Sequence, residues 1–171
     1  MYRKLKIVML STLAALALAA CTGESADAAG QAGSDSDVAA ITLTTFKSPT
    51  CGCCGQWVEH ARDNGFRVSV KDVDDLNGVK ASHKIAPRHQ SCHTSVSAEG
   101  FVFEGHIPAK YIRQFLQAPP AGARGLAVPA MPLGSPGMEV DDRFTPYTVM
   151  LLHEDGSESV YARIDSAAQQ H

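Results

Sequence analysis

Three cysteines stand within four residues, and a fourth follows further along the chain. The cluster is Cys51-Gly52-Cys53-Cys54, and the distant thiol is Cys92. Thiolates are soft ligands that favour Cu(I) over hard cations, and three of them within one turn can converge on a metal. Cys51 and Cys54 also have the C-x-x-C spacing of a redox pair. The extra thiol, Cys53, favours a metal site, because it adds a ligand there but would invite mispaired bridges in a disulfide enzyme.

Two other interpretations of these thiols stay open. In a thiol-disulfide oxidoreductase, Cys51 and Cys54 would sit at a helix N-terminus, where the dipole favours the thiolate. The plainest alternative is a structural disulfide in an oxidising compartment. A bridge between Cys51 and Cys54 closes too small a loop to restrict the unfolded chain much. Zinc is a further candidate ion, but cysteines together with methionines favour copper.

Imidazole and thioether groups supply further candidate ligands. His93 follows Cys92 directly, and His106 begins a His-Ile-Pro sequence; imidazole suits both copper and zinc. Met131 and Met138 lie in a loop rich in Pro and Gly, without the helical spacing of core residues. A thioether binds Cu(I) without deprotonation, but it can equally be an adaptable apolar filler. The candidate metal ligands are thus Cys51, Cys53, Cys54, Cys92, His93, His106, Met131 and Met138.

Hydrophobic periodicity predicts the elements that must position these ligands. We expect strands at 39–46, 66–70, 92–97 and 100–104, and helices at 56–64, 74–84 and 108–118. A hairpin of strands at 147–152 and 157–164 follows a long ordered loop at 121–146. This order predicts an α/β, thioredoxin-like fold (β-α-β-α-β-β-α) with an added C-terminal β-hairpin.

The expected strand directions bring the candidate ligands together. In a thioredoxin-like fold the third strand is antiparallel to the first, so its start at Cys92 and His93 lies beside the CGCC turn. The fourth strand is antiparallel to the third, and its far end carries His106 back to the same rim. This convergence rests on fold-level analogy until the site itself is described.

The N-terminal sequence predicts export and a lipid anchor. Basic residues precede an apolar run at 7–20 that is too short to span a bilayer comfortably. The run ends in Leu18-Ala19-Ala20-Cys21, a pattern typical of bacterial lipoprotein signals, in which Cys21 would be lipidated. Several acyl chains give stable anchoring. Thr22, rather than Asp, favours the outer membrane by resemblance to lipoprotein sorting rules; an ordinary cleaved signal peptide is the alternative.

The remaining sequence predicts one folded domain. Residues 21–38 combine the lipidated cysteine with a tether rich in Gly, Ala, Ser and Asp, after a signal peptide at 1–20. The metal-binding domain is expected at 39–165, and a disordered tail at 166–171. The net charge of -3, with scattered Lys and Arg, makes nucleic acid an unexpected partner. Membrane contact is expected through the lipid anchor alone.

Four motifs resemble a known family. They cover nearly all of residues 42–164, in the order CGCC followed by Trp57, SCHT at 91–94, GHIP at 105–108 and GLAVPAMPLGSPGME at 125–139. The chain is similar to the CopG-like metal-binding proteins of bacterial copper-resistance clusters. The resemblance implies a periplasmic, thioredoxin-like, copper-binding domain. Its implied ligands come from Cys51, Cys53, Cys54, Cys92 and His106. The segment 128–139, which carries Met131 and Met138 and is called the methionine loop below, is implied to lie beside them.

One residue departs from that family's pattern: Ala130 stands between Pro129 and Met131, where Gly is common. We expect a periplasm-facing copper-binding protein of copper resistance or homeostasis, whose partners are copper and other periplasmic copper-handling proteins. Bridging thiolates could hold more than one ion. Mixed sulfur and nitrogen ligands would support interconversion of Cu(I) and Cu(II), and hence oxidoreductase activity. The alternatives are a thiol-disulfide oxidoreductase and a passive copper chaperone or buffer without turnover.

Overall fold

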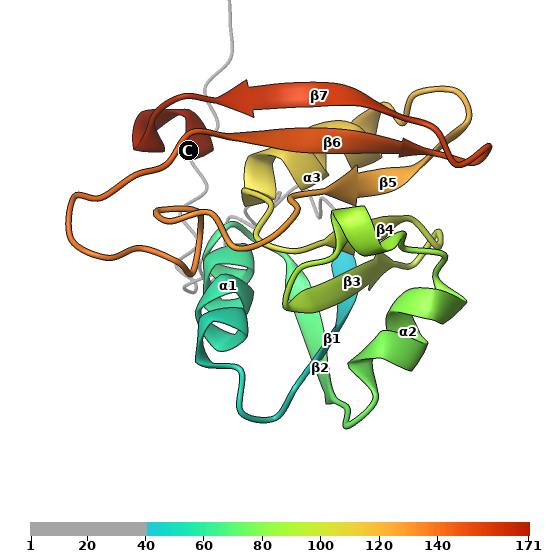
Figure 1. Ribbon diagram of the computed structural model, residues 1–171, viewed down its shortest axis with the longest axis horizontal. Coiled ribbons are helices and arrows are strands. Elements are labelled where there is room, and N and C mark those ends of the chain that lie inside the picture. The colour runs from blue at the N-terminus through green and yellow to red at the C-terminus, as the bar shows by residue number, and fades with distance from the viewer. Residues whose placement is uncertain (1–40) are drawn as a thin grey trace, which may run out of the picture. The chain divides into compact units, whose positions relative to one another are not determined.

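The computed structural model describes residues 41–171, and a seven-stranded mixed sheet runs through them. The predicted signal peptide, Cys21 and the tether lie outside the described residues. Figure 1 labels the seven strands and the three α-helices. In chain order the elements are β1 (Thr42–Lys47), α1 (Gly52–Asp63), β2 (Arg67–Asp72), α2 (Leu76–Ser82), the short 3-10 helix η1 (Pro87–His89), β3 (His93–Ser97), β4 (Val102–Glu104), α3 (Ala109–Gln117), β5 (Ala123–Ala127), β6 (Tyr147–His153), β7 (Glu158–Ile164) and the 3-10 helix η2 (Ala167–Gln170).

The sheet has the strand order β2-β1-β3-β4-β5-β6-β7. β1 pairs in parallel with β2 and antiparallel with β3, and β4 is antiparallel to β3. These are the directions that the sequence predicts for the strands flanking the cysteines. The expected C-terminal hairpin is also present, since β6 and β7 pair antiparallel. The fold is therefore mixed α/β, with the end of β1 beside the start of β3.

The structure corrects the prediction for residues 121–146. Their first part is not a loop: β5 pairs in parallel with β4 and antiparallel with β6. Gly125 interrupts the apolar pattern of this short strand, which conceals it in the sequence. A Cβ atom at Gly125 would lie 1.8 Å from the Val102 carbonyl oxygen. Close strand pairing thus requires the glycine that makes the strand hard to recognise.

Helix α1 begins at Gly52, four residues earlier than expected, with Cys51 as its N-cap. Cys53 and Cys54 therefore lie in the first helical turn. Two glycines lower the helix propensity of this turn, but tertiary packing overrides that preference. Cys54 is fully buried, as are Trp57 and Ala61 further along the helix.

The hydrophobic core joins α1 and α3 to the sheet. Its fully buried members include Trp57 of α1, Phe115 of α3, and Leu43, Phe103 and Leu126 from three strands. No helix within residues 41–171 has both the length and the apolar character needed to cross a membrane.

The C-terminal segment carries structure where the sequence predicts a disordered tail. Residues 167–170 form η2, and Gln170 is buried. Its amide nitrogen donates to the Gly134 carbonyl at 2.9 Å, and its amide oxygen accepts from the Tyr147 hydroxyl at 2.6 Å. These two hydrogen bonds hold the segment against the 134–144 loop and β6.

Candidate metal centre

The connection from β1 to α1 positions three of the four thiols. β1 ends at Lys47, a short turn follows, and the helix begins beside the rim of the sheet. The Trp57 indole N–H donates to the Ile107 carbonyl at 2.9 Å. This hydrogen bond ties α1 to the residue after His106, so the cysteine turn and the end of β4 are held together.

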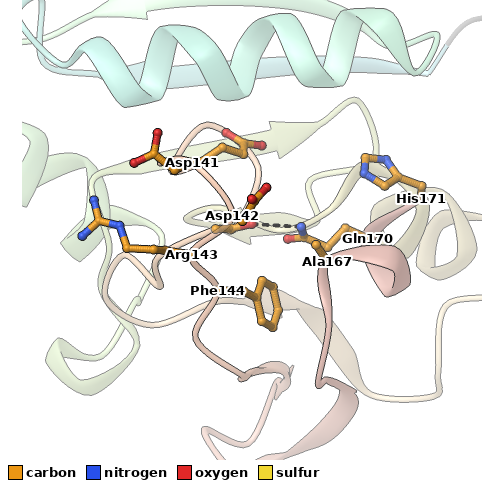
Figure 2. A pocket seen from close by; sticks show the side chains of 9 residues that line it. Asp141, Asp142, Arg143, Phe144, Ala167, Gln170 and His171 are labelled. Atoms are coloured by element: carbon orange, nitrogen blue, oxygen red, sulfur yellow. Dashed lines mark hydrogen bonds between the residues drawn. The ribbon is translucent and has the colours of Figure 1, made fainter.

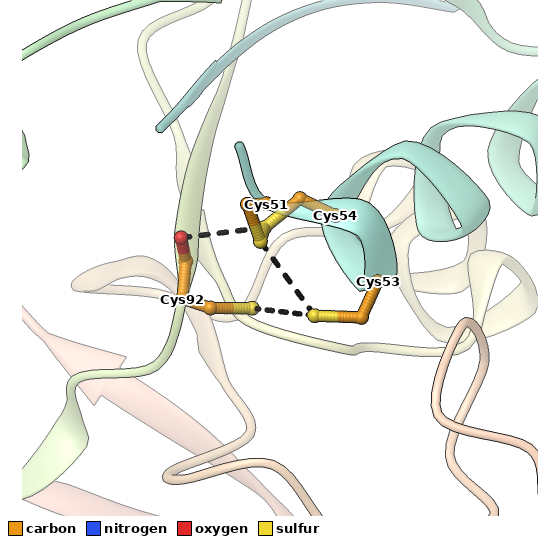
Figure 3. Close-up of side chains that lie close together, drawn as sticks. All are labelled: Cys51, Cys53, Cys54 and Cys92. Atoms are coloured by element: carbon orange, nitrogen blue, oxygen red, sulfur yellow. Dashed lines mark hydrogen bonds between the residues drawn. A yellow bond between two sulfur atoms is a disulfide. The ribbon is translucent and has the colours of Figure 1, made fainter. Parts of the chain in front are cut away.

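Two of the thiols are joined and two are free. Cys51 and Cys54 form a disulfide, whereas Cys53 and Cys92 are free thiols (Figure 3). The Cys53 sulfur lies 3.6 Å from the Cys51 sulfur and 3.9 Å from the Cys92 sulfur. All four sulfur atoms lie within 4.8 Å of one another. We call this set of four cysteines the sulfur cluster.

Cys92 also belongs to a second group of donors. Its sulfur lies 2.9 Å from Nε2 of His106 and 3.4 Å from Nδ1 of His93. The three donor atoms again lie within 4.8 Å of one another. We call Cys92, His93 and His106 the imidazole group. The structure therefore brings together six of the eight predicted ligand residues, and Cys92 is common to both groups.

A backbone carbonyl fixes the tautomer of His106. Its Nδ1 lies 2.7 Å from the Pro136 carbonyl oxygen, which can only accept a hydrogen bond, so Nδ1 carries the proton. In the neutral ring, Nε2 then presents its lone pair to the Cys92 sulfur. Burial lowers the pKa of His106, although the Pro136 carbonyl and Glu139 act in the opposite direction. The neutral ring is the form that can accept a thiol proton or bind a metal.

Burial also shifts the pKa values of the other two members of the imidazole group. It raises the pKa of Cys92 to about 12, with the adjacent Cys53 adding to the effect. His93 is fully buried and its pKa is well below the usual value, because burial and the nearby His106 and Lys80 disfavour its cation. Its ring centroid lies 4.5 Å from that of Trp57. The His93 Nε2 atom is buried and, within residues 41–171, has no hydrogen-bond partner.

The methionine loop lies against the first turn of α1. Gly137 has a positive φ of 82°, and a Cβ atom there would come within 2.7 Å of both the Cys53 carbonyl oxygen and the Trp57 nitrogen. Met138 follows directly and is partly buried, whereas Met131 is 50% exposed. The loop thus reaches the sulfur cluster through its backbone. A ligand role for either thioether stays a prediction.

Ala130 has a positive φ of 59°, which explains why glycine suits this position. Its N–H donates to the Gln90 carbonyl at 3.1 Å, and its carbonyl accepts from the Ser91 hydroxyl. The left-handed conformation therefore fastens the start of the methionine loop to the two residues before Cys92. A methyl group in this conformation costs about 1–2 kcal/mol.

We expect Ala130→Gly to stabilise the protein by about 0.5 kcal/mol, because relief of the left-handed strain exceeds the added entropy of the unfolded chain. Urea unfolding monitored by circular dichroism measures the change. The matched control is Ala118→Gly, at an exposed position with a φ of -148°, where glycine should destabilise. Equal effects of the two substitutions would contradict the strain argument.

A buried ion pair supports the segment that carries Cys92. The Lys80 ammonium contacts the Glu104 carboxylate, and both side chains are almost fully buried. Thr94 donates to the same carboxylate at 2.6 Å and accepts from Lys80 at 3.1 Å. The Ser91 backbone N–H also donates to Glu104, at 2.7 Å. Glu104 therefore fixes the residues on both sides of Cys92 and His93.

Sequence reasoning missed this network. Lys80 and Glu104 are residue types that usually lie at the surface, and nothing in their spacing couples them. The only available signal was the position of Glu104 in an apolar strand, immediately before the Gly105-His106 motif. The hydrogen bond between His106 and the Pro136 carbonyl was also missed, because the position of a backbone group cannot be recognised from residue types.

A separate cavity of about 230 Å³ lies beyond the donor groups (Figure 2). It is lined by the 134–144 loop and the C-terminal segment, with Phe144, Gln170 and His171 among its residues. None of its lining residues belongs to the sulfur cluster or the imidazole group. The two donor groups, at the rim formed by α1, β3 and the end of β4, therefore do not line this cavity.

Comparison with known proteins finds one family model and two solved structures that match the chain. Residues 89–138 match a family described as "Protein of unknown function, DUF411". No curated protein matches the chain. Two solved structures, "Copper resistance protein copG- Form 2" and "Copper resistance protein copG- Form 1", are each 38% identical to it, with TM-scores of 0.69 and 0.68. Each match covers 72% of this chain, and 98% and 97% of the respective structures. The chain therefore belongs to the CopG-like family of copper-resistance proteins.

Proposed function

We propose that this protein binds copper at the sulfur cluster and the imidazole group, in copper resistance. The observation that carries the proposal is that Cys92 belongs to both groups, with four sulfur atoms and two imidazoles converging from three separate segments. Sulfur donors fit Cu(I), and imidazole tolerates both copper oxidation states. His93 presents its Nδ1 atom to this site, 3.4 Å from the Cys92 sulfur.

The redox state of the cysteines determines which donors are available. With Cys51 and Cys54 bridged, the free thiols are Cys53 and Cys92. A disulfide sulfur lacks the negative charge of a thiolate ligand. Two-electron reduction of the bridge yields four thiols, which together could hold more than one Cu(I). The fully reduced protein is thus the form with the highest expected copper capacity.

The mixed donor set supports interconversion of Cu(I) and Cu(II) as part of the proposal. Thiolate and thioether ligands favour Cu(I), whereas imidazole accommodates Cu(II). Because the two groups meet at Cys92, a change of oxidation state would shift the preferred donors without removing the ion from the site. Met131 and Met138, on the loop against α1, are proposed as further soft ligands.

The proposal places the protein in the periplasm, anchored by lipid at Cys21, at the outer membrane. The sequence at 18–21 and the basic residues before the apolar run support this placement. The element order before β5 supports classing the domain as thioredoxin-like. Other periplasmic copper-handling proteins are the proposed partners for delivery or release of the ion.

A thiol-disulfide oxidoreductase is the second candidate function. The disulfide between Cys51 and Cys54 favours it, because this C-x-x-C pair lies at the N-terminus of α1. Such an enzyme should remain active in a Cys53→Ser variant, since the third thiol has no part in the exchange. A passive copper buffer, by contrast, should bind tightly without catalysing electron transfer.

The decisive test is metal loading of the reduced protein. We expect the variant with Cys51, Cys53 and Cys54 all replaced by Ser to lose most of its Cu(I), because three of the four sulfur ligands are gone. Metal analysis after anaerobic loading with Cu(I) or Zn(II) measures the stoichiometry. His153→Ala, a change on β6 outside both groups, is the matched control and should bind as the wild type does. An unchanged Cu(I) stoichiometry in the triple variant would contradict the proposal.

A further inference from the structure

The four sulfur atoms form a continuous chain. Cys54 is bonded to Cys51, the Cys53 sulfur lies 3.6 Å from that of Cys51, and the Cys92 sulfur lies 3.9 Å from that of Cys53 (Figure 3). A free thiol therefore touches the existing disulfide, and a second free thiol touches the first. Thiol-disulfide exchange proceeds by attack of a thiolate on a disulfide sulfur, and these distances place each attacking sulfur beside its target.

We propose that the disulfide migrates within the cluster, from Cys51–Cys54 to Cys53–Cys92, with Cys53 as the intermediate nucleophile. The functional meaning of this step rests on the proposed copper site. The exchange itself needs no metal and can be tested without one.

Atoms and electrons balance in two steps without an external oxidant or reductant. The Cys53 thiolate first attacks the Cys51 sulfur, so that a Cys51–Cys53 bond forms and Cys54 leaves as a thiolate. The Cys92 thiolate then attacks the Cys53 sulfur, a Cys53–Cys92 bond forms, and Cys51 leaves. The protons lost by Cys53 and Cys92 are regained by Cys54 and Cys51. One disulfide and two thiols are present before and after.

His106 lies where the second step needs a base. Its Nε2 atom, 2.9 Å from the Cys92 sulfur, carries a lone pair because the Pro136 carbonyl holds the proton on Nδ1. The ring can therefore accept the Cys92 proton as the sulfur attacks.

The position of the bridge determines which donors are free. With Cys51–Cys54 bridged, Cys92 stays in the imidazole group beside the two histidines. With Cys53–Cys92 bridged, that group loses its sulfur, and the Cys51/Cys54 dithiol at the start of α1 becomes free. The same oxidation level thus gives two sites of different chemistry, one of sulfur with nitrogen and one of sulfur alone.

Disulfide mapping of the metal-free protein tests the migration. In a Cys21→Ser background, the chelator-treated protein is equilibrated in an anaerobic glutathione buffer that gives one disulfide per chain. Free thiols are then alkylated with N-ethylmaleimide, and the one-disulfide species is isolated and digested with trypsin. Cleavage places the first three cluster cysteines in peptide 48–62 and Cys92 in peptide 89–110. We expect a cross-linked pair of these peptides, joined through Cys53 and Cys92, beside the species bridged within 48–62.

Two variants decide between this route and its alternatives. Cys53→Ser should lose the cross-linked pair completely while keeping the Cys51–Cys54 bridge, which also reports that its local fold is intact. The variant with both Cys51 and Cys54 replaced by Ser should form the Cys53–Cys92 bridge under mild oxidation. A wild-type protein bridged at Cys51–Cys54 alone, a cross-link that survives Cys53→Ser, or a double variant that forms no bridge would each overturn the proposal. Because no copper is used, these outcomes are independent of the metal-loading test.

Discussion

Lys80→Met is expected to destabilise the folded protein by about 3–5 kcal/mol, because it leaves the buried Glu104 carboxylate without its counter-charge. Glu104 is fully buried and the Lys80 side chain is 3% exposed. Burial raises the pKa of Glu104 even though Lys80, Thr94 and the Ser91 N–H act to lower it. Desolvation is thus already the largest influence on this carboxyl with the pair intact. The midpoint of urea unfolding, at an unchanged slope, measures the loss.

Two controls separate burial of a lone charge from loss of a lysine. The double variant Lys80→Met/Glu104→Gln removes both charges, and we expect it to be more stable than Lys80→Met alone. Arg88→Met breaks a contact with Glu158 in which the Arg88 side chain is 57% exposed, and it should cost less than about 1 kcal/mol. A loss of stability in Lys80→Met no larger than that in Arg88→Met would contradict this expectation.

The ion pair connects stability to the candidate metal centre. Glu104 accepts hydrogen bonds from the Ser91 N–H and from Thr94, which flank Cys92 and His93 in the chain. Its backbone carbonyl also accepts from the Val128 N–H, at 2.9 Å, where β5 ends before the methionine loop. A buried charge that costs free energy is thus placed where it fixes the position of the ligands. Apolar packing at this position would lack those directional contacts.

The convergence of the ligands could be predicted from the sequence because the expected element order, by analogy with a thioredoxin-like fold, implies the strand directions. β3 and β4 follow one another in the chain and pair antiparallel, so a residue at the start of β3 must lie beside one at the end of β4. Cys92 and His106 occupy those two positions. The turn after β1 lies at this rim too, because β1 pairs antiparallel with β3.

Other features could not be predicted because they depend on tertiary contacts. The early start of α1 depends on packing around Cys54 and the close approach of Gly137, both invisible to local propensity. β5 is short and contains Gly125, which the adjacent strand requires. The pairing of Cys51 with Cys54 was one of several alternatives that spacing alone left open. The Pro136 carbonyl that fixes the His106 tautomer is a backbone atom in a loop.

Cys92→Ser should weaken Cu(I) binding more than any other single cysteine substitution, because only Cys92 belongs to both donor groups among residues 41–171. Loss of a residue that merely orients a ligand typically costs 10–100-fold in metal affinity. We therefore expect a loss of more than about 100-fold for this shared ligand. Anaerobic competition with a coloured Cu(I) chelator, in a phosphine reductant that keeps all thiols reduced, measures the affinity.

Comparison with two further variants shows whether the groups act as one site. Cys53→Ser removes a sulfur from the sulfur cluster alone, and Met131→Leu changes a half-exposed side chain of similar volume on the loop. If the two groups bind copper together, the loss should be largest for Cys92→Ser and smaller for Cys53→Ser, with Met131→Leu smallest. If the two groups bind copper independently, Cys92→Ser and Cys53→Ser should weaken Cu(I) binding at the sulfur cluster equally. Only the first order is compatible with a shared centre at which sulfur and imidazole donors hold the same copper.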